Sequence, residues 1–121
     1  MNQNEDKKIL IVDDTSVNRM LIKTILKSFG FTSVDEASNG KEAIRRVEEN
    51  EYALIFMDVQ MSVMDGIQAT NFIRNSLMRT IPIVAITAFG NIEMEKNGFN
   101  DLIRKPYGVE KIKNAFYRFM K

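Results

Sequence analysis

Short apolar runs alternate with longer segments of helical period along the whole chain. Five runs have strand character, the second of them weakly, at residues 9–12, 33–36, 53–57, 83–86 and 101–104. Uninterrupted apolar character in the first, third and fourth runs is typical of strands covered on both faces, so we expect these three at the centre of a sheet. Strands that alternate with helices predict βαβ units and an α/β fold with a parallel sheet.

The segments after these runs carry helical signals. Gly30 is a stop signal for the first helix, and Asp65 is a good N-cap for the third. Helices are predicted at about 17–29, 40–50, from 66 onward, 92–97 and 109–120. The fourth spans little more than a turn and a half. The expected buried stripes are Val17, Met20, Leu21, Thr24, Ile25 and Ser28 in the first helix and Val109, Ile112, Phe116 and Phe119 in the last.

Length and composition limit the organisation of the chain. Its 121 residues suffice for one domain with a core, which we expect to span residues 1–121 with the packed part at about 8–120. No apolar stretch approaches the roughly 20 residues of a membrane-spanning helix. Residues 1–8 are polar, unlike a secretory signal. We therefore expect a cytoplasmic location and no membrane contact.

The absence of two residue types narrows the possible chemistry. The chain contains no cysteine and no histidine, which excludes thiolate and imidazole metal ligands and Ser-His-Asp catalysis. A metal bound by this chain must be a hard cation on oxygen ligands. The net charge of +1 provides no overall attraction for nucleic acid, so direct binding of DNA or RNA is not expected.

Polar side chains follow the predicted strands at their carboxyl ends. Asp13 and Asp14 follow the first run, Asp58 the third, Thr87 the fourth and Lys105 the fifth. Because the carboxyl ends of parallel strands meet at one edge of a sheet, we expect these side chains to share a small volume. Clustered carboxylates oppose one another's ionisation, and Mg²⁺ relieves that repulsion. The set predicts a magnesium-assisted phosphoryl site.

Each of these residues also has a purely structural interpretation. Asp14, or Ser16 close behind it, is a suitable cap for the first helix, with the other acid solvated. Taken alone, Lys105 equally fits a surface amine and Thr87 a buried hydroxyl bonded to a carbonyl. Asp58 is followed by no obvious helix start and needs no role as a cap. Their joint position at one edge favours the functional interpretation.

Four fragments in order resemble one known family. They are ILIVDD at 9–14, FMDVQM at 56–61 with MDG at 64–66, ITA at 86–88 and KP at 105–106. Over about residues 8–120 the chain resembles the response-regulator receiver domains, the CheY-like group. The resemblance implies a flavodoxin-like (βα)5 fold, a three-layer sandwich with a parallel five-stranded sheet in the order 2-1-3-4-5.

The resemblance also implies roles for the acidic residues. Asp58 would accept a phosphoryl group from a phosphohistidine on a sensor histidine kinase or a histidine phosphotransfer protein. Asp14 would hold Mg²⁺ directly and Asp13 through water, and Asp58 and the backbone carbonyl of Gln60 would complete the protein ligands. The chemistry would be limited to self-phosphorylation from a donor and self-dephosphorylation by water, with no external substrate.

Lys105 and Thr87 receive roles from the resemblance as well. Lys105 would pair with the phosphoryl oxygens, and its peptide bond to Pro106 would be cis, as is plausible only before proline. Thr87 would move toward the phosphoryl group and report its presence. The output would be contact with a downstream protein or onward phosphotransfer, from a monomer or a weak phosphorylation-dependent dimer.

Three departures from the family pattern bear on this switch. Ser62 stands where the loop after the phosphoacceptor usually has proline, and Leu102 stands where an aromatic residue normally couples to Thr87. The chain between Thr87 and Gly98 is about one helical turn short. Phe89 and Tyr107 are the aromatic residues that might replace Leu102, although packing is favoured for both.

Other functions were weighed against this one. Leu102 and the shortened fourth helical segment motivate an alternative, a receiver-fold interaction module that works without phosphorylation. The sequence after the first strand, Asp13-Asp14-Thr15, would repel the phosphate of a flavin. Gln60 occupies the position where a metal-dependent phosphatase would need a second acid. The basic residues Arg19, Lys23 and Lys27 either face a partner or form a solvated face of the first helix.

Overall fold

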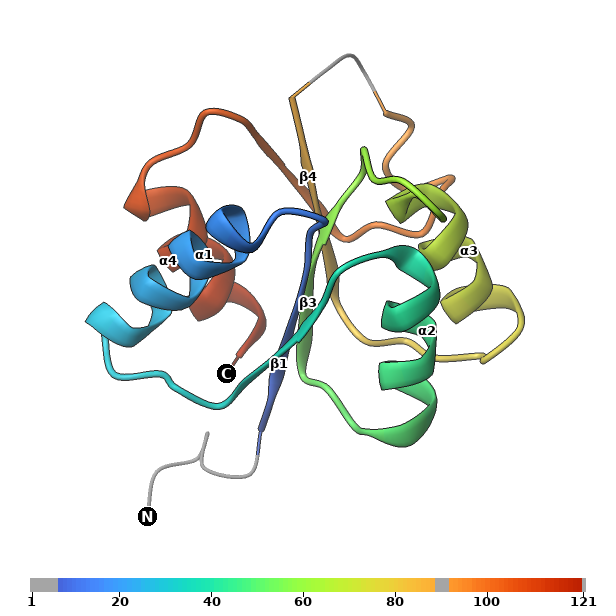
Figure 1. Cartoon of the computed structure of the whole chain (residues 1–121), viewed down its shortest axis with the longest axis horizontal. Coiled ribbons are helices and arrows are strands. Elements are labelled where there is room, and N and C mark those ends of the chain that lie inside the picture. Colours follow the sequence, from blue (N-terminus) through green and yellow to red (C-terminus); the bar gives the residue numbers. More distant parts are fainter. Residues whose placement is uncertain (1–6, 89–91, 121) are drawn as a thin grey trace.

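A parallel sheet forms the centre of the molecule. The computed structural model describes residues 7–88 and 92–120 (Figure 1). All five strands are parallel in the order β2-β1-β3-β4-β5, which confirms the predicted fold class. The strands are β1 (Ile9–Val12), β2 (Val34–Ala37), β3 (Leu54–Asp58), β4 (Ile83–Thr87) and β5 (Asp101–Arg104).

Helices cover both faces of this sheet. Figure 1 shows α1 (Ser16–Ser28) and α4 (Val109–Phe119) on one side and α2 (Gly40–Glu49) and α3 (Gly66–Asn75) on the other. β1 contributes to two cores, because Ile9 and Ile11 belong to the cluster under α1 and α4 and the alternate residues belong to the cluster under α2 and α3. The three-layer arrangement therefore explains the uninterrupted apolar strands.

The start of α3 follows the sequence signal closely. The Asp65 side chain accepts the backbone N–H of Gln68 at 2.8 Å, and the Gln68 side chain accepts the backbone N–H of Asp65 at 3.4 Å. This reciprocal capping box satisfies donors that the first turn of a helix leaves without partners. Asp65 is confirmed as the N-cap.

The predicted buried face of α1 is wrong except at Ile25. The buried residues are Ile22, Ile25 and Leu26, whereas Val17, Met20 and Leu21 are 75%, 65% and 47% exposed. The helix carries apolar residues on two overlapping stripes, and packing against the sheet and α4 selects one of them. Val109 at the start of α4 is also exposed, while the rest of the predicted stripe of α4, Ile112, Phe116 and Phe119, is buried or partly buried.

The predicted helix at 92–97 is not formed. Within 92–120 the only helix is α4, and Met94–Gly98 forms a single turn in which the backbone N–H of Asn97 donates to the carbonyl of Glu93 at 3.1 Å. The turn ends at Gly98, whose φ of +89° is a conformation that favours glycine. The segment is too short to continue as a helix and still return to the sheet at β5.

Arg74 on α3 holds this turn in place. Its guanidinium donates to the carbonyl of Gly98 at 2.9 Å, to the carbonyl of Arg79 at 3.0 Å and to the side-chain oxygen of Asn100 at 2.8 Å. The same Asn100 oxygen accepts the backbone N–H of Ile83 at the start of β4 at 2.9 Å. One side chain thus ties the turn to α3 and β4, although residues 92–97 form no helix.

We expect Arg74→Met to destabilise the fold by about 2–3 kcal/mol, because a charged donor to three acceptors is lost while its aliphatic stem is kept. Urea unfolding followed by circular dichroism measures this change. Arg45→Met on α2 is the matched control, since Arg45 is exposed, and it should change stability by less than about 0.5 kcal/mol. Equal effects of the two substitutions would contradict the role of Arg74.

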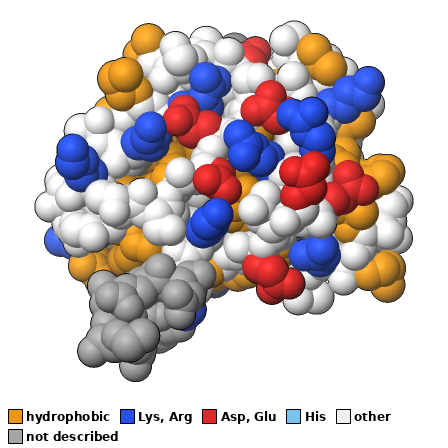
Figure 2. All heavy atoms as spheres, turned by 60° about the horizontal axis from the view of Figure 1, so that its bottom comes forward, with side chains coloured by type: hydrophobic (Ala, Val, Ile, Leu, Met, Phe, Trp, Pro, Cys, Tyr) orange, Lys and Arg blue, Asp and Glu red, His pale blue; other side chains and the backbone are white. Residues whose placement is uncertain are grey.

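The charged residues outside the site are mixed in sign. On the face turned forward in Figure 2, lysines and arginines lie among aspartates and glutamates with apolar side chains between them. This face therefore offers no continuous basic surface. Among the described residues, no helix combines the length and the apolar character that crossing a membrane requires.

Candidate functional site

Three carboxylates gather at the edge where the parallel strands end. Asp13 and Asp14 follow β1, Asp58 is the last residue of β3, and each offers an oxygen within 4.8 Å of the others. Asp13 and Asp58 are buried, at 3% and 2% exposure, and Asp14 is exposed. The predicted meeting of the three acids is confirmed, and its open side faces solvent at Asp14.

A lysine and a hydroxyl complete this group. The Nζ atom of Lys105 lies 3.5 Å from Oδ1 of Asp58 and 3.8 Å from Oδ2 of Asp13. Thr87 is the last residue of β4, is fully buried, and its carbonyl accepts the backbone N–H of Lys105 at 2.8 Å. The peptide bond between Lys105 and Pro106 is cis. The structure thus brings the three acids and Lys105 together, and the backbone of Thr87 is bonded to that of Lys105.

Asp13 is held by neighbours that sequence analysis did not single out. Its Oδ1 accepts the backbone N–H of Thr15 at 3.0 Å and the Thr15 hydroxyl at 2.9 Å. Arg19 donates to the backbone carbonyl of Asp13 at 2.6 Å and to Glu36 on β2 at 2.9 Å. Oδ2 of Asp13 is thereby directed toward Lys105. No pattern in the neighbouring sequence predicted these contacts of Asp13.

The structural interpretation of Asp14 and Ser16 as caps is wrong. The N-cap of α1 is Thr15, which makes no side-chain capping bond. The first turn of α1 also contains no acidic residue. Asp14 is thus free of a capping role and is available at the open side of the cluster.

The buried Asp58 carboxylate is costly to ionise. Burial, and next the nearby Asp13 carboxylate, raise the pKa of Asp58 to about 6, although the Lys105 ammonium acts in the opposite direction. A second positive charge near these oxygens would favour ionisation further. The cluster therefore has the electrostatics and the oxygen donors that suit a hard divalent cation.

Gln60 contacts two members of the cluster. Its backbone N–H is hydrogen-bonded to Asp58, and its side-chain oxygen Oε1 accepts the hydroxyl of Thr87 at 3.2 Å. Sequence analysis assigned Gln60 a role only through its backbone carbonyl, as a metal ligand, and predicted no contact of its side chain. The side-chain bond joins residues 27 positions apart, and no sequence pattern indicated it.

Comparison with known proteins accounts for this geometry. Residues 9–117 match the family described as response regulator receiver domain. The chain belongs to this family. It is a receiver domain of two-component or phosphorelay signalling.

Relatives and solved structures show the range of this family. The receiver domain is 40% identical over 121 residues to the osmosensing histidine protein kinase SLN1 of Saccharomyces cerevisiae, covering 93% of this chain and 10% of that protein. It is 37% identical to the chemotaxis protein CheY of Bacillus subtilis, covering 89% of this chain and 92% of CheY. The crystal structure of the receiver domain of a Pseudomonas aeruginosa sensor histidine kinase has a TM-score of 0.82 at 32% identity, covering 94% of this chain and 97% of that one. That structure holds a magnesium ion in its active-site cleft.

Leucine occupies the position on β5 where the family usually has an aromatic residue. Leu102 on β5 is partly buried and packs on the core under α2 and α3. Tyr107 is partly buried against the other core, and burial, followed by the charges of Asp13 and Asp58, raises its pKa to about 12. Tyr107 therefore packs beside the site, as predicted, and Phe89 lies outside the described residues.

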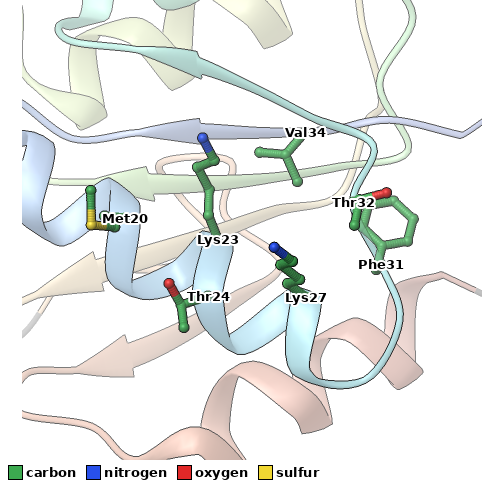
Figure 3. A pocket seen from close by; sticks show the side chains of 7 residues that line it. All are labelled: Met20, Lys23, Thr24, Lys27, Phe31, Thr32 and Val34. Atoms are coloured by element: carbon green, nitrogen blue, oxygen red, sulfur yellow. The ribbon is translucent and has the colours of Figure 1, made fainter.

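The three basic residues of α1 do not form one surface. Arg19 and Lys23 both pair with Glu36 on β2, at 2.9 and 3.0 Å. Lys27 lies with Lys23 along a groove of about 330 Å³ between α1 and β2, whose floor is made by Phe31 and Val34 (Figure 3). Arg19 and Lys23 are thus paired within the domain. The residues that line the groove do not include Asp13, Asp14 or Asp58.

Proposed function

We propose that this receiver domain takes a phosphoryl group onto Asp58 from a phosphohistidine of a histidine kinase or histidine phosphotransfer protein. A carboxylate oxygen of Asp58 attacks phosphorus, the bond from phosphorus to the histidine nitrogen breaks, and that nitrogen keeps the electron pair. The single observation that carries the proposal is the position of Asp58, buried among two acids with Lys105 at 3.5 Å. Phosphoryl transfer needs mainly this kind of positioning and charge neutralisation.

The donor set also supports Mg²⁺ as the cofactor. Asp13, Asp14, Asp58 and the backbone carbonyl of Gln60 are the groups that would hold it, and all are oxygen ligands. When bound, Mg²⁺ supplies positive charge that neutralises the carboxylates and the incoming phosphoryl oxygens. The related receiver domain from Pseudomonas aeruginosa, which holds a magnesium ion, supports this assignment.

The remaining residues act on the phosphoryl group itself. Lys105, already within reach of Asp58, pairs with one phosphoryl oxygen. The Thr87 hydroxyl donates a hydrogen bond to another phosphoryl oxygen, and the side chain moves toward Asp58. Water then attacks phosphorus, the bond from phosphorus to the Asp58 oxygen breaks, and inorganic phosphate leaves. Asp58 returns to its free carboxylate, which limits the duration of the signal without any external substrate.

A protein partner is supported by the surface beside the site. Val17, Met20 and Leu21 are exposed on the first turns of α1, directly after the two acids that follow β1. Asp58 is buried, so a donor must approach closely over this rim, and apolar side chains there would be covered by it. Several relatives are histidine kinases, of which this chain spans only a small part.

Incubation with a small phosphodonor such as acetyl phosphate tests the proposal. We expect a mass increase of one phosphoryl group that requires Mg²⁺ and disappears with a chelator, and peptide mapping should place it on Asp58. A wild-type domain that gains no mass with Mg²⁺ and donor would contradict the proposal. So would a group on another residue.

Magnesium binding should depend on pH. Because the pKa of Asp58 is raised to about 6, the metal-free site holds a proton below that pH, and Mg²⁺ must displace it. We expect the affinity to be nearly constant above about pH 7 and to weaken by up to about tenfold per pH unit below about 6. Titration calorimetry at several pH values measures this. Affinity that stays constant down to about pH 5 would contradict the shifted pKa.

Two features favour a second function: the turn at Met94–Gly98, where a helix was predicted at 92–97, and Leu102 on β5. The alternative is a receiver domain that binds its partner regardless of phosphorylation. Comparing the affinity of one partner for the phosphorylated and unphosphorylated domain separates the two. An unchanged affinity would favour the interaction module over the switch.

A further inference from the structure

The side chain of Gln60 has no part in the proposed phosphoryl chemistry, yet it is bonded to the hydroxyl that has one. Thr87 donates to Oε1 of Gln60 at 3.2 Å, while the backbone N–H of Gln60 bonds to Asp58. Thr87 is fully buried, and Gln60 is exposed on the loop after β3. A single surface residue therefore contacts both the phosphoacceptor and the hydroxyl that would report it.

The chemistry of a hydroxyl makes this bond exclusive. A threonine hydroxyl has one proton and donates it to one acceptor at a time. While the proton points to Oε1 of Gln60, it is not available to a phosphoryl oxygen on Asp58. An anionic phosphoryl oxygen is a stronger acceptor than a neutral amide oxygen, so the exchange proceeds once Asp58 is modified.

We propose that Gln60 is a positioning residue, whose side chain holds Thr87 in the unphosphorylated domain and is released when Thr87 turns to the phosphoryl group. The inference rests on the proposed function. Leu102 stands where an aromatic residue is usual, and its side chain offers no hydrogen bond to Thr87. Gln60 would supply this restraint on Thr87 instead. The Gln60 side chain thus opposes the phosphorylated arrangement.

The exposed loop that follows Gln60 carries the movement of the released side chain to the surface of the domain. Val59 is held by the sheet, because its N–H donates to the carbonyl of Ile86 at 2.9 Å and its own carbonyl accepts the N–H of Gly66 at 3.1 Å. Beyond Val59 the loop is exposed at Ser62 and at Val63, which is 75% exposed. Ser62 lacks the ring that a proline would place there, so the loop is not stiffened at that position.

Binding of beryllium fluoride, a phosphoryl mimic, with Mg²⁺ tests this role. Gln60→Met keeps the shape of the side chain and its backbone carbonyl but removes the strong acceptor. We expect Gln60→Met to bind beryllium fluoride with Mg²⁺ about 2- to 12-fold more tightly than the wild type, the worth of one neutral hydrogen bond. Affinity for Mg²⁺ alone, measured in parallel, separates an effect on the metal site, to which the backbone carbonyl of Gln60 belongs, from an effect on the mimic.

A double-mutant cycle separates this bond from other effects of the substitution. In a Thr87→Val background the hydroxyl is absent, so Gln60→Met should no longer change the affinity for the mimic. The NMR signal of the Thr87 methyl group in the metal-free protein gives a readout independent of the mimic, and Gln60→Met should shift it.

Four results would overturn the inference. An equal affinity of Gln60→Met and wild type for the mimic, or the same gain in the Thr87→Val background, would remove the role of Gln60 while the proposed function stands. A Thr87 methyl signal that Gln60→Met leaves in place would do the same. A wild-type domain that binds Mg²⁺ but no beryllium fluoride would overturn both the proposed function and this inference.

Discussion

We expect Asp58→Asn to abolish the uptake of a phosphoryl group while leaving a folded and more stable domain. The amide has no anionic oxygen to attack phosphorus, and it removes one charge from the group that would hold Mg²⁺. The amide also has no charge to bury. Burial and the Asp13 carboxylate make ionisation of Asp58 unfavourable and raise its pKa to about 6. We expect a gain in metal-free stability at about pH 7 of about 1–3 kcal/mol.

Intact mass after treatment with acetyl phosphate and Mg²⁺ measures the loss, and urea unfolding measures the gain. Asp65→Asn is the matched control. Asn caps a helix about as well as Asp, and residue 65 lies outside the acidic cluster, so this variant should be phosphorylated like the wild type. Undiminished modification of Asp58→Asn would show that another residue is the acceptor.

Gly66→Ala should be among the most destabilising single-methyl additions to this domain. A Cβ atom at Gly66 would lie 2.2 Å from the backbone carbonyl oxygen of Asp58 and 2.9 Å from Cγ of Met57. These are atoms of a central strand that cannot yield, so the start of α3 must move away from β3. We expect a loss of about 3 kcal/mol or more in the free energy of unfolding, together with slower phosphorylation of the displaced Asp58.

Gly108→Ala provides the control for this substitution. A Cβ atom at Gly108 meets nothing within 4 Å, so the added methyl group should change stability by no more than about 1 kcal/mol. Urea unfolding of both variants makes the comparison. If Gly66→Ala is no less stable than Gly108→Ala, the contact between α3 and the end of β3 is looser than the structure shows.

The site residues were predictable because each directly follows a strand or ends one. Asp58, Thr87 and Lys105 come from segments far apart in the chain, but the rule that parallel strands end at one edge needs only the strand pattern to place them together. Their partners were less accessible to sequence analysis. The bond from Thr87 to Gln60 and the three bonds of Arg74 depend on side-chain conformations that become defined only when the elements pack.

The sequence by itself determined the five strands, their parallel arrangement and the identity of the residues at their carboxyl ends, because periodicity and strand-end position are local properties of the chain. Tertiary structure alone decided which stripe of α1 is buried and that residues 92–97 form no helix. The physical reason is that α1 has two apolar stripes of similar character, and only contact with the sheet and α4 distinguishes them. The turn at Met94–Gly98 is likewise anchored by Arg74, a residue of α3, which donates to the carbonyl of Gly98.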